Sequence, residues 1–293
     1  MIILDGKALA EEIKLDLKEK VAAILASGGR APHLAAILVG EDGASKTYVA
    51  HKVKMCNEVG YRSSLITLPA DISESGLLEE VYRLNADTMI DGYIVQLPLP
   101  KHIQPDTITQ AIDHRKDVDG FHPVNIGRMT QGLPSYLPAT PMGIMQLLAK
   151  YNVATAGKHC VIIGRSSIVG TPMSILLSRN SDPGNCTVTM CHSRTANIKE
   201  FTLQADIIIA ALGKPEFVTA DMVKPGAVII DVGITRVEDS NAKSGYKLKG
   251  DVAYNEVSTL SSFITPVPGG VGPLTVTSLM QNTLLAYNRA VYA

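Results

Sequence analysis

The sequence predicts an α/β protein of two domains, each built around a parallel sheet. Short apolar runs alternate with amphipathic patterns of helical period, first in one half of the chain and then again in the other. The chain has 293 residues, of which 46% are hydrophobic, and this is enough to bury a core in each half. We expect residues 1–140 and 275–293 to form one domain, residues 141–274 the other, with a cleft between them.

In the first half, apolar residues at helical spacing predict a helix over residues 7–26, which ends at Gly28 and Gly29. The elements predicted next are strand 33–39, helix 44–58, strand 62–68, a helix capped by Ser73 that runs to Leu84, strand 93–97 and a polar loop over 113–123. Pro98 and Pro100 end the last strand.

In the second half, Thr140 as an N-cap followed by Pro141 predicts a helix that runs to Lys150. The strands predicted after it are 160–163, 187–190, 206–211 and 227–232. Residues 238–249 are polar and predict a surface loop, and a last helix is expected over about 275–289.

The composition and net charge exclude several classes of partner and location. The formal net charge is −1, which argues against a nucleic-acid or membrane partner that binds through bulk charge. No signal peptide and no membrane span is expected, because the start of the chain lacks a basic segment and no apolar run is long enough. The four cysteines lack zinc-site spacing, so we expect no metal and a reducing, cytoplasmic location.

The run from Cys160 to Gly170 reads as a buried strand, a tight turn and the start of a helix. Gly164 permits the turn, and Gly170 permits close packing of the helix on the sheet. Free N–H groups at a helix start favour an anion such as a dinucleotide pyrophosphate. The spacing, Gly-x-Ser-x-x-x-Gly, differs from the usual Gly-x-Gly-x-x-Gly, and an ordinary βα turn is the alternative.

The type of dinucleotide is predicted from the end of the next strand. NAD-binding units carry an acidic residue there for the ribose 2′-hydroxyl, but this chain has Ser193 and Arg194 instead. A hydroxyl and a fixed cation suit a 2′-phosphate, and Arg165 is a further candidate, so we predict NADP over NAD. The alternative is that Arg194 is a solvated surface charge.

Tyr48 and Lys52 stand four residues apart and share one face of a predicted helix. A tyrosine ring can stack on a flat heterocycle, and a lysine in a partly dry cleft can act in acid–base chemistry. The alternative is an ordinary surface pair. A Tyr-x-x-x-Lys pair also occurs in short-chain dehydrogenases, but there it follows the glycine-rich loop, whereas here it precedes that loop.

Further polar candidates lie at strand and loop ends. Gln96 follows a predicted parallel strand, where α/β proteins bind ligands, and Asp119 can accept two N–H bonds from an aminopyrimidine edge. The turn over 265–275, which contains Pro268 and Gly269, can line a ligand cleft or serve as a linker. For Gln96 and Asp119 the alternative is a polar group satisfied by backbone.

Six motifs together resemble the bifunctional methylenetetrahydrofolate dehydrogenase/cyclohydrolase family of the bacterial FolD type. They are Tyr-Val-x-x-Lys at 48–52, Val-Gln-Leu-Pro-Leu-Pro at 95–100, Lys-Asp-Val-Asp-Gly-Phe at 116–121, Gly-Arg-Ser-x-Ile-Val-Gly-x-Pro at 164–172, Asp-Val-Gly-Ile at 231–234 and Pro-Gly-Gly-Val-Gly-Pro at 268–273. They occur in the family's order over nearly the whole chain. Ala139 stands where the family commonly has cysteine, and a small residue is kept.

The resemblance implies oxidation of 5,10-methylenetetrahydrofolate by NADP⁺, hydrolysis of the product to 10-formyltetrahydrofolate, and a homodimer. It implies that Lys52 is the general acid/base of hydrolysis, that Gln96 tunes it, that Tyr48 stacks on the folate and that Asp119 anchors the pterin. It further implies that the cofactor is held by Gly164, Arg165, Ser166, Ser193 and Ile234, and that the substrate also contacts Pro268 and Gly269. Two alternatives stay open: another two-domain NADP oxidoreductase, and a non-catalytic NADP-binding module.

Overall fold

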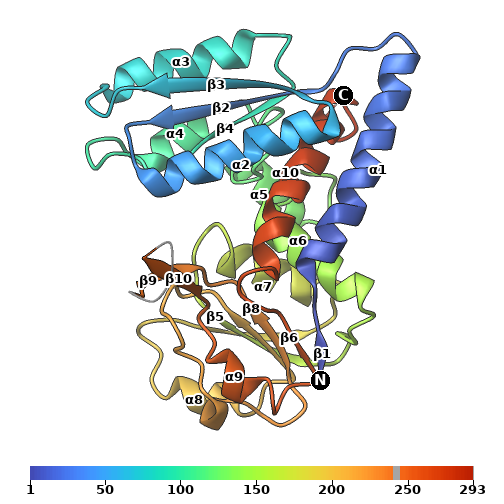
Figure 1. The fold of residues 1–293 in the computed structure, drawn as a ribbon, viewed down its shortest axis with the longest axis vertical. Helices are drawn as coiled ribbons and strands as arrows, with labels where there is room; N and C mark the ends of the chain where they lie inside the picture. Colours follow the sequence, from blue (N-terminus) through green and yellow to red (C-terminus); the bar gives the residue numbers. More distant parts are fainter. Residues whose placement is uncertain (240–244, 293) are drawn as a thin grey trace. The chain divides into compact units, whose positions relative to one another are not determined.

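The computed structural model describes residues 1–239 and 245–292 (Figure 1). The chain divides into two compact units, and each is assembled from two stretches of sequence. The unit that we call the large-sheet unit comprises Met1–Ala10 and Thr140–Thr275. The small-sheet unit comprises Glu11–Ala139 and Val276–Ala293. Both contain a parallel sheet, as the alternation of strands and helices predicts.

Three parallel strands form the sheet of the small-sheet unit, in the order β3-β2-β4. They are β2 (His33–Val39), β3 (Arg62–Leu68) and β4 (Gly92–Val95). All seven residues of the central strand β2 are buried, which explains its nearly unbroken apolar sequence. Since the strands run in one direction, their carboxyl ends share one edge of the sheet, and Gln96 follows β4 at that edge.

Helices cover this sheet. The helices of the unit are α2 (Gly43–Val59), α3 (Glu74–Ala86), α4 (Pro105–Ala111), α5 (Pro123–Thr130), and the larger parts of α1 (Gly6–Ala26) and α10 (Val271–Tyr287). The helices α1, α2 and α3 lie within two residues of their predicted bounds, whereas α4 and α5 were not predicted. Ile37 and Tyr93 of the sheet pack with Leu77 of α3 and Ile108 of α4 in one buried core. The Ser73 hydroxyl accepts a hydrogen bond from the Gly76 N–H at 3.1 Å and caps α3, as expected.

Six parallel strands form the sheet of the large-sheet unit, in the order β1-β11-β8-β7-β5-β6. They are β1 (Ile2–Ile3), β5 (His159–Ile163), β6 (Thr187–Cys191), β7 (Ile207–Ala210), β8 (Val228–Asp231) and β11 (Phe263–Ile264). The chain adds β6 on one side of β5 and then returns to add β7 on the other side. The carboxyl ends of β5 and β7 therefore form a topological switch point, the place where open α/β sheets bind ligands.

Short helices connect these strands. They are α6 (Ala139–Lys150), α7 (Gly170–Ser178), α8 (Ile198–Thr202), the 3₁₀ turn η1 (Ala220–Met222) and α9 (Tyr254–Val257). Val161 of β5, Ile208 of β7 and Ile229 of β8 point to one face of the sheet and form a buried core with Val257 of α9. No helix in the described ranges is both long and apolar enough to cross a membrane.

The segment predicted as a surface loop over 238–249 differs from that expectation. It contains the end of β9 (Thr235–Glu238) and all of β10 (Tyr246–Lys249), which pair as an antiparallel hairpin. Residues 240–244 of the expected loop lie outside the described residues. The polar side chains that suggested a loop lie on a half-exposed ribbon, and the Arg236 guanidinium stacks over the Tyr246 ring at 4.8 Å.

Two helix starts also differ from expectation. α6 begins at Ala139, so Thr140 lies inside the helix, and its hydroxyl lies 2.9 Å from that of Thr275. α10 begins at Val271 rather than near 275, because a proline in the first turn, here Pro273, interrupts no helical hydrogen bond.

Residues 1–10 belong to the large-sheet unit, although the sequence analysis assigned them to the first domain. The reason is β1, which pairs in parallel with β11 at the edge of the six-stranded sheet. The Ile2 N–H donates to the Ser262 carbonyl at 2.7 Å, and the Leu4 N–H donates to that of Ile264 at 2.8 Å. A two-residue strand held by backbone bonds leaves no pattern that sequence analysis can detect.

Candidate active site

Lys52 and Gln96 meet in the small-sheet unit. Lys52 lies on α2, and Gln96 directly follows β4. The Lys52 Nζ donates to the Gln96 Oε1 at 3.1 Å, and the Gln96 Nε2 donates to the Leu97 carbonyl at 2.7 Å. The second bond fixes the amide so that its oxygen, and not its nitrogen, faces the lysine.

Burial changes the acid–base properties of this lysine. Desolvation lowers the pKa of Lys52 from its ordinary value, and the nearby Asp119 carboxylate opposes that shift. At a given pH a larger fraction of Lys52 is therefore in the neutral form than for an exposed lysine. A neutral amine can accept a proton from water.

Asp119 lies in the loop that runs beside β4. The Tyr93 N–H donates to the Lys116 carbonyl at 3.0 Å, which aligns this loop with the strand. Burial raises the pKa of the Asp119 carboxyl, and the charge of Lys52 lowers it in turn. The structure thus brings together three of the predicted residues, Lys52, Gln96 and Asp119, in one unit.

Tyr48 precedes Lys52 by one turn of α2, and its side chain is 47% exposed. An exposed tyrosine ring one turn from Lys52 is available to stack on a flat ligand. The helix α2 is closed by Gly60 in the left-handed conformation, with φ of 84°.

Asp117 was missed by sequence reasoning. It is 2% exposed, and its Oδ2 accepts from the His122 N–H at 2.8 Å and from the Asn125 Nδ2 at 2.9 Å. These bonds shape the loop that carries Asp119. Only the alternation of acid and apolar residues in Lys-Asp-Val-Asp-Gly-Phe marked it, and that pattern does not tell which acid points inward.

The glycine-rich turn after β5 has the geometry that a dinucleotide needs. Gly164 has φ of +132°, and a Cβ on it would lie 2.2 Å from the Ala211 carbonyl oxygen. A Cβ on Gly170 would lie 2.2 Å from the Gly164 carbonyl oxygen. Both positions therefore require glycine, because the turn packs closely against the end of β7 and against the start of α7. The turn lies at the switch point of the sheet, where open α/β sheets bind ligands.

Ser166 and Arg165 occupy the turn between these glycines. The Ser166 hydroxyl accepts from the Val169 N–H at 3.2 Å and lies 3.4 Å from the Gly170 nitrogen at the start of α7. Arg165 is exposed. The residues present fit a dinucleotide: a tight turn at the switch point, a helix start, and an exposed cation beside both.

The other predicted cofactor residues follow neighbouring strands of the same unit. Ser193 and Arg194 come after β6 and are exposed, and no acidic side chain stands at that strand end. Ile234 comes after β8 and is 40% exposed. Pro268 and Gly269 also lie in this unit, before α10, and therefore in the unit that does not contain Lys52.

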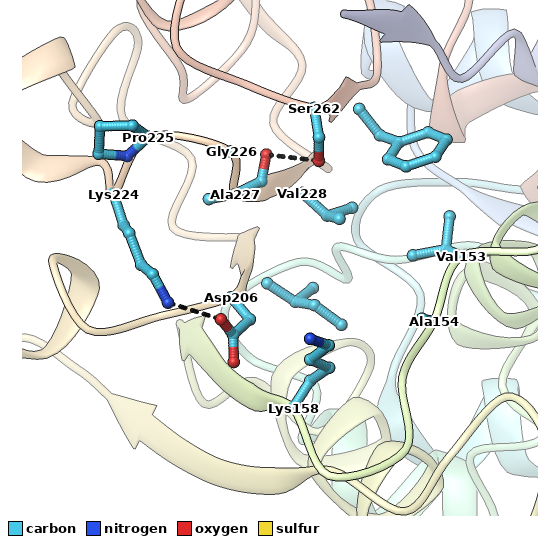
Figure 2. Close-up of a pocket in the computed structure, with 12 residues that line it drawn as sticks. Val153, Ala154, Lys158, Asp206, Lys224, Pro225, Gly226, Ala227, Val228 and Ser262 are labelled. Atoms are coloured by element: carbon cyan, nitrogen blue, oxygen red, sulfur yellow. Dashed lines mark hydrogen bonds and ion pairs between the residues drawn. The ribbon is translucent and has the colours of Figure 1, made fainter.

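A separate cavity of about 270 Å³ is lined by Lys158, Asp206 and Val228, among others (Figure 2). These residues lie at the amino ends of β5, β7 and β8, whereas the glycine-rich turn follows the carboxyl end of β5. Lys224 reaches Asp206 there, with 2.7 Å between Nζ and Oδ1. The cavity contains none of the predicted site residues. Within residues 1–239 and 245–292, no three His, Cys, Asp or Glu side chains are grouped to hold a metal ion.

Comparison with known families matches both parts of the chain. The family model of the tetrahydrofolate dehydrogenase/cyclohydrolase catalytic domain matches residues 4–119, and that of the NAD(P)-binding domain matches residues 138–291. The chain is 62% identical over 286 residues to the bifunctional protein FolD of Cytophaga hutchinsonii, covering 98% of this chain and 99% of that protein. It is 58% identical over 292 residues to that of Bacteroides fragilis, covering 100% of both.

Solved structures agree with these matches. The bifunctional FolD enzyme of Campylobacter jejuni superposes with a TM-score of 0.92 at 47% identity, covering 99% of each chain. The Trypanosoma brucei dehydrogenase-cyclohydrolase, solved with NADP and an inhibitor, gives a TM-score of 0.93 at 38% identity, covering 100% of this chain and 99% of that one. Taken with the residues that the two units assemble, these matches show that the chain belongs to the tetrahydrofolate dehydrogenase/cyclohydrolase family.

Proposed function

We propose that this chain is a bifunctional enzyme that oxidises 5,10-methylenetetrahydrofolate with NADP⁺ and then hydrolyses the methenyl product to 10-formyltetrahydrofolate. The observation that carries the proposal is the contact between Lys52, a lysine with a lowered pKa, and Gln96. Family membership over both units and the NADP-bound relative from Trypanosoma brucei support the reaction and the cofactor.

In the first reaction, the nicotinamide accepts a hydride from the one-carbon unit. The protein contributes binding and position. Tyr48 stacks on the folate, and Asp119 accepts N–H bonds from its aminopyrimidine edge. Gly164, Ser166 and Ile234 form the cofactor surface in the large-sheet unit, and Pro268 and Gly269 complete the folate contacts.

NADP is proposed over NAD from Ser193 and Arg194, which follow β6, together with Arg165, which follows the neighbouring strand β5. Arg194 and Arg165 are exposed cations, and Ser193 is an exposed hydroxyl, so a 2′-phosphate finds two fixed charges and a donor there. No carboxylate stands at this strand end to repel it.

In the second reaction, water adds to the methenyl carbon and one of its C–N bonds opens. The Lys52 amine accepts the proton of the attacking water, and Gln96 holds that amine through its Oε1. The substrate is a cation, so a neutral amine is favoured over an ammonium beside it.

We further propose that two copies of this chain form a homodimer and that the protein is located in the cytoplasm. β6 forms an edge of the six-stranded sheet, and an edge strand can pair with a second copy. The four cysteines are free and buried, in keeping with a reducing compartment. Light scattering on the purified protein tests the dimer against the 31.3 kDa monomer mass.

The test of the function is a spectrophotometric assay of Lys52→Met with each folate substrate and with NADP⁺ or NAD⁺. Hydrolysis of the methenyl substrate is expected to fall to the uncatalysed rate, while NADP⁺ still binds with wild-type affinity. Lys54→Met is the matched control, because Lys54 lies on the same helix and is exposed.

Two results would contradict the proposal. Full hydrolysis by Lys52→Met removes the lysine from the mechanism. Equal or better use of NAD⁺ by the wild-type protein removes the assignment of the residues after β6 to a 2′-phosphate.

A further inference from the structure

Two aspartates of the large-sheet unit, Asp231 and Asp251, are buried near the carboxyl ends of β7 and β8. None of the reaction steps above uses them. Asp231 is the last residue of β8 and is 3% exposed, and Asp251 is fully buried. A buried carboxylate is retained only where its hydrogen bonds offset the lost hydration. The bonds that these two groups accept therefore indicate what they do.

Asp251 holds the turn after β7. Its Oδ2 accepts from the Leu212 N–H at 2.7 Å and from the Gly213 N–H at 2.9 Å. The preceding residue, Ala211, contacts the glycine-rich turn in two ways. Its carbonyl oxygen leaves no room for a Cβ on Gly164, and the Ala211 N–H donates to the Ile163 carbonyl at 2.9 Å. Asp251 thus sets the position of the segment against which the glycine-rich turn rests.

Asp231 holds the backbone at Asp251 and Val252, and also the segment that leads to Ile234. Its Oδ1 accepts from the Gly233 N–H at 3.0 Å and from the Asp251 N–H at 2.9 Å, and its Oδ2 accepts from the Val252 N–H at 3.0 Å. Gly233 immediately precedes Ile234. The fit is tight, because a Cβ on Gly233 would lie 2.3 Å from the Asp251 Oδ1.

We propose that Asp251 and Asp231 are positioning residues for the cofactor: together they fix the turn at 211–213, after β7, and the segment at 231–234, after the neighbouring strand β8. The Leu212 and Gly213 N–H groups are directed at Asp251, so the acid orients the turn and these N–H groups do not bind the phosphates themselves. This inference rests on the proposed NADP function and adds two residues to it.

The first test is Asp251→Asn, which keeps the size of the side chain but removes the charge from two hydrogen bonds. The dissociation constant of NADP⁺, measured by calorimetry without folate, is expected to rise about tenfold, the difference between charged and neutral acceptors. Hydrolysis of the methenyl substrate without NADP⁺ is expected to keep its wild-type kcat, because Lys52 lies in the other unit.

A second pair of variants separates positioning from general destabilisation. Gly213 and Gly226 both have positive φ, +66° and +85°, and both have open space where a Cβ would point. Gly213→Ala strains the turn held by Asp251, which follows the carboxyl end of β7. Gly226→Ala strains a turn at the other end of the strands, just before the amino end of β8, where Gly226 lines the cavity in Figure 2. Each left-handed alanine costs about 1–2 kcal/mol.

Positioning predicts that Gly213→Ala weakens NADP⁺ binding roughly five- to thirtyfold, the range that corresponds to this strain, while Gly226→Ala leaves binding unchanged. Equal weakening by both alanines, or unchanged binding in Asp251→Asn and Gly213→Ala, overturns the proposal. Wild-type protein that fails to bind NADP⁺ at all would instead refute the proposed function, so the two failures are distinguishable.

Discussion

At the scale of single residues, the site depends on one amine that is partly removed from water. Burial lowers the pKa of Lys52, and the charge of Asp119 raises it again. Neither residue type is unusual in itself. What distinguishes them is that a helix, a strand end and a loop place them within one unit, beside an amide oxygen 3.1 Å from the amine.

The pH dependence of hydrolysis follows from this balance. The rate is expected to rise with pH as Lys52 loses its proton, with a midpoint below the ordinary lysine value of 10.5. Asp119→Asn removes the carboxylate that favours the ammonium, so the midpoint is expected to move to lower pH. The measurement is kcat/KM for methenyl hydrolysis across pH, after subtraction of the enzyme-free rate.

Glu58→Gln is the control for this shift, because Glu58 is on the same helix but forms its ion pairs with Lys14 and Lys54 at the surface. Its midpoint is expected to match the wild type, since solvent screens exposed charges. A midpoint that moves to higher pH in Asp119→Asn would mean that the two groups do not interact as described.

At the scale of elements, the sequence predicted central strands such as β2, β7 and β8 from their apolar runs, because these strands are buried along their whole length. β2 and β3 have the predicted bounds, and β5 and β8 come within one residue of theirs. The segment 238–249, which contains β10 and the end of β9, was predicted as a loop because this ribbon is half-exposed and polar. Apolar residues alternate along a strand only where one face of the strand is buried. A ribbon without a buried face therefore has no clear apolar periodicity in its sequence.

The residues of the candidate site also divide into those that the sequence predicted and those that it did not. Lys52, Gln96 and Asp119 follow recognisable motifs and come together in one unit. Asp251 gave no separate signal, because its partners are backbone N–H groups that no residue type reveals. Asp117 gave none either, because one of its partners is a backbone N–H and the other is the side chain of Asn125, which no motif links to it. Asp251 in particular bonds to Leu212 and Gly213, almost forty residues away in the sequence.

The turn after β5 makes an element-scale prediction. Gly164→Ala is expected to destabilise the protein by about 1–3 kcal/mol, since its Cβ would overlap the Ala211 carbonyl, and to weaken NADP⁺ binding. Gly157→Ala is the matched control, with positive φ of +73° and open space around the Cβ position. Urea unfolding and NADP⁺ calorimetry measure both; a smaller loss of stability in Gly164→Ala than in Gly157→Ala would contradict the overlap.

At the scale of the whole molecule, the chain builds each unit from two separate stretches. α1 begins with residues of the large-sheet unit and continues with residues of the small-sheet unit, and α10 does the same near the other end of the chain. The small-sheet unit therefore depends on residues 276–292 as well as on its first stretch. In that unit the Tyr61 hydroxyl donates to the Met280 carbonyl at 2.9 Å.

Asn282 of α10 is where this dependence can be measured. It is 1% exposed, and its Nδ2 donates to the Val118 carbonyl at 2.8 Å and to the Leu137 carbonyl at 2.9 Å. Asn282→Leu keeps the branching and the number of side-chain heavy atoms but leaves both carbonyls buried without these donors, at about 1–3 kcal/mol each. Because Asp119 directly follows Val118, we expect the midpoint of urea unfolding to fall and the KM for folate to rise together, with little change in NADP⁺ affinity. Asn288→Leu, at an exposed position beyond the end of the same helix, is expected to change none of these quantities. A folate KM that stays at the wild-type value while stability falls would show that α10 supports the unit without positioning the loop that carries Asp119.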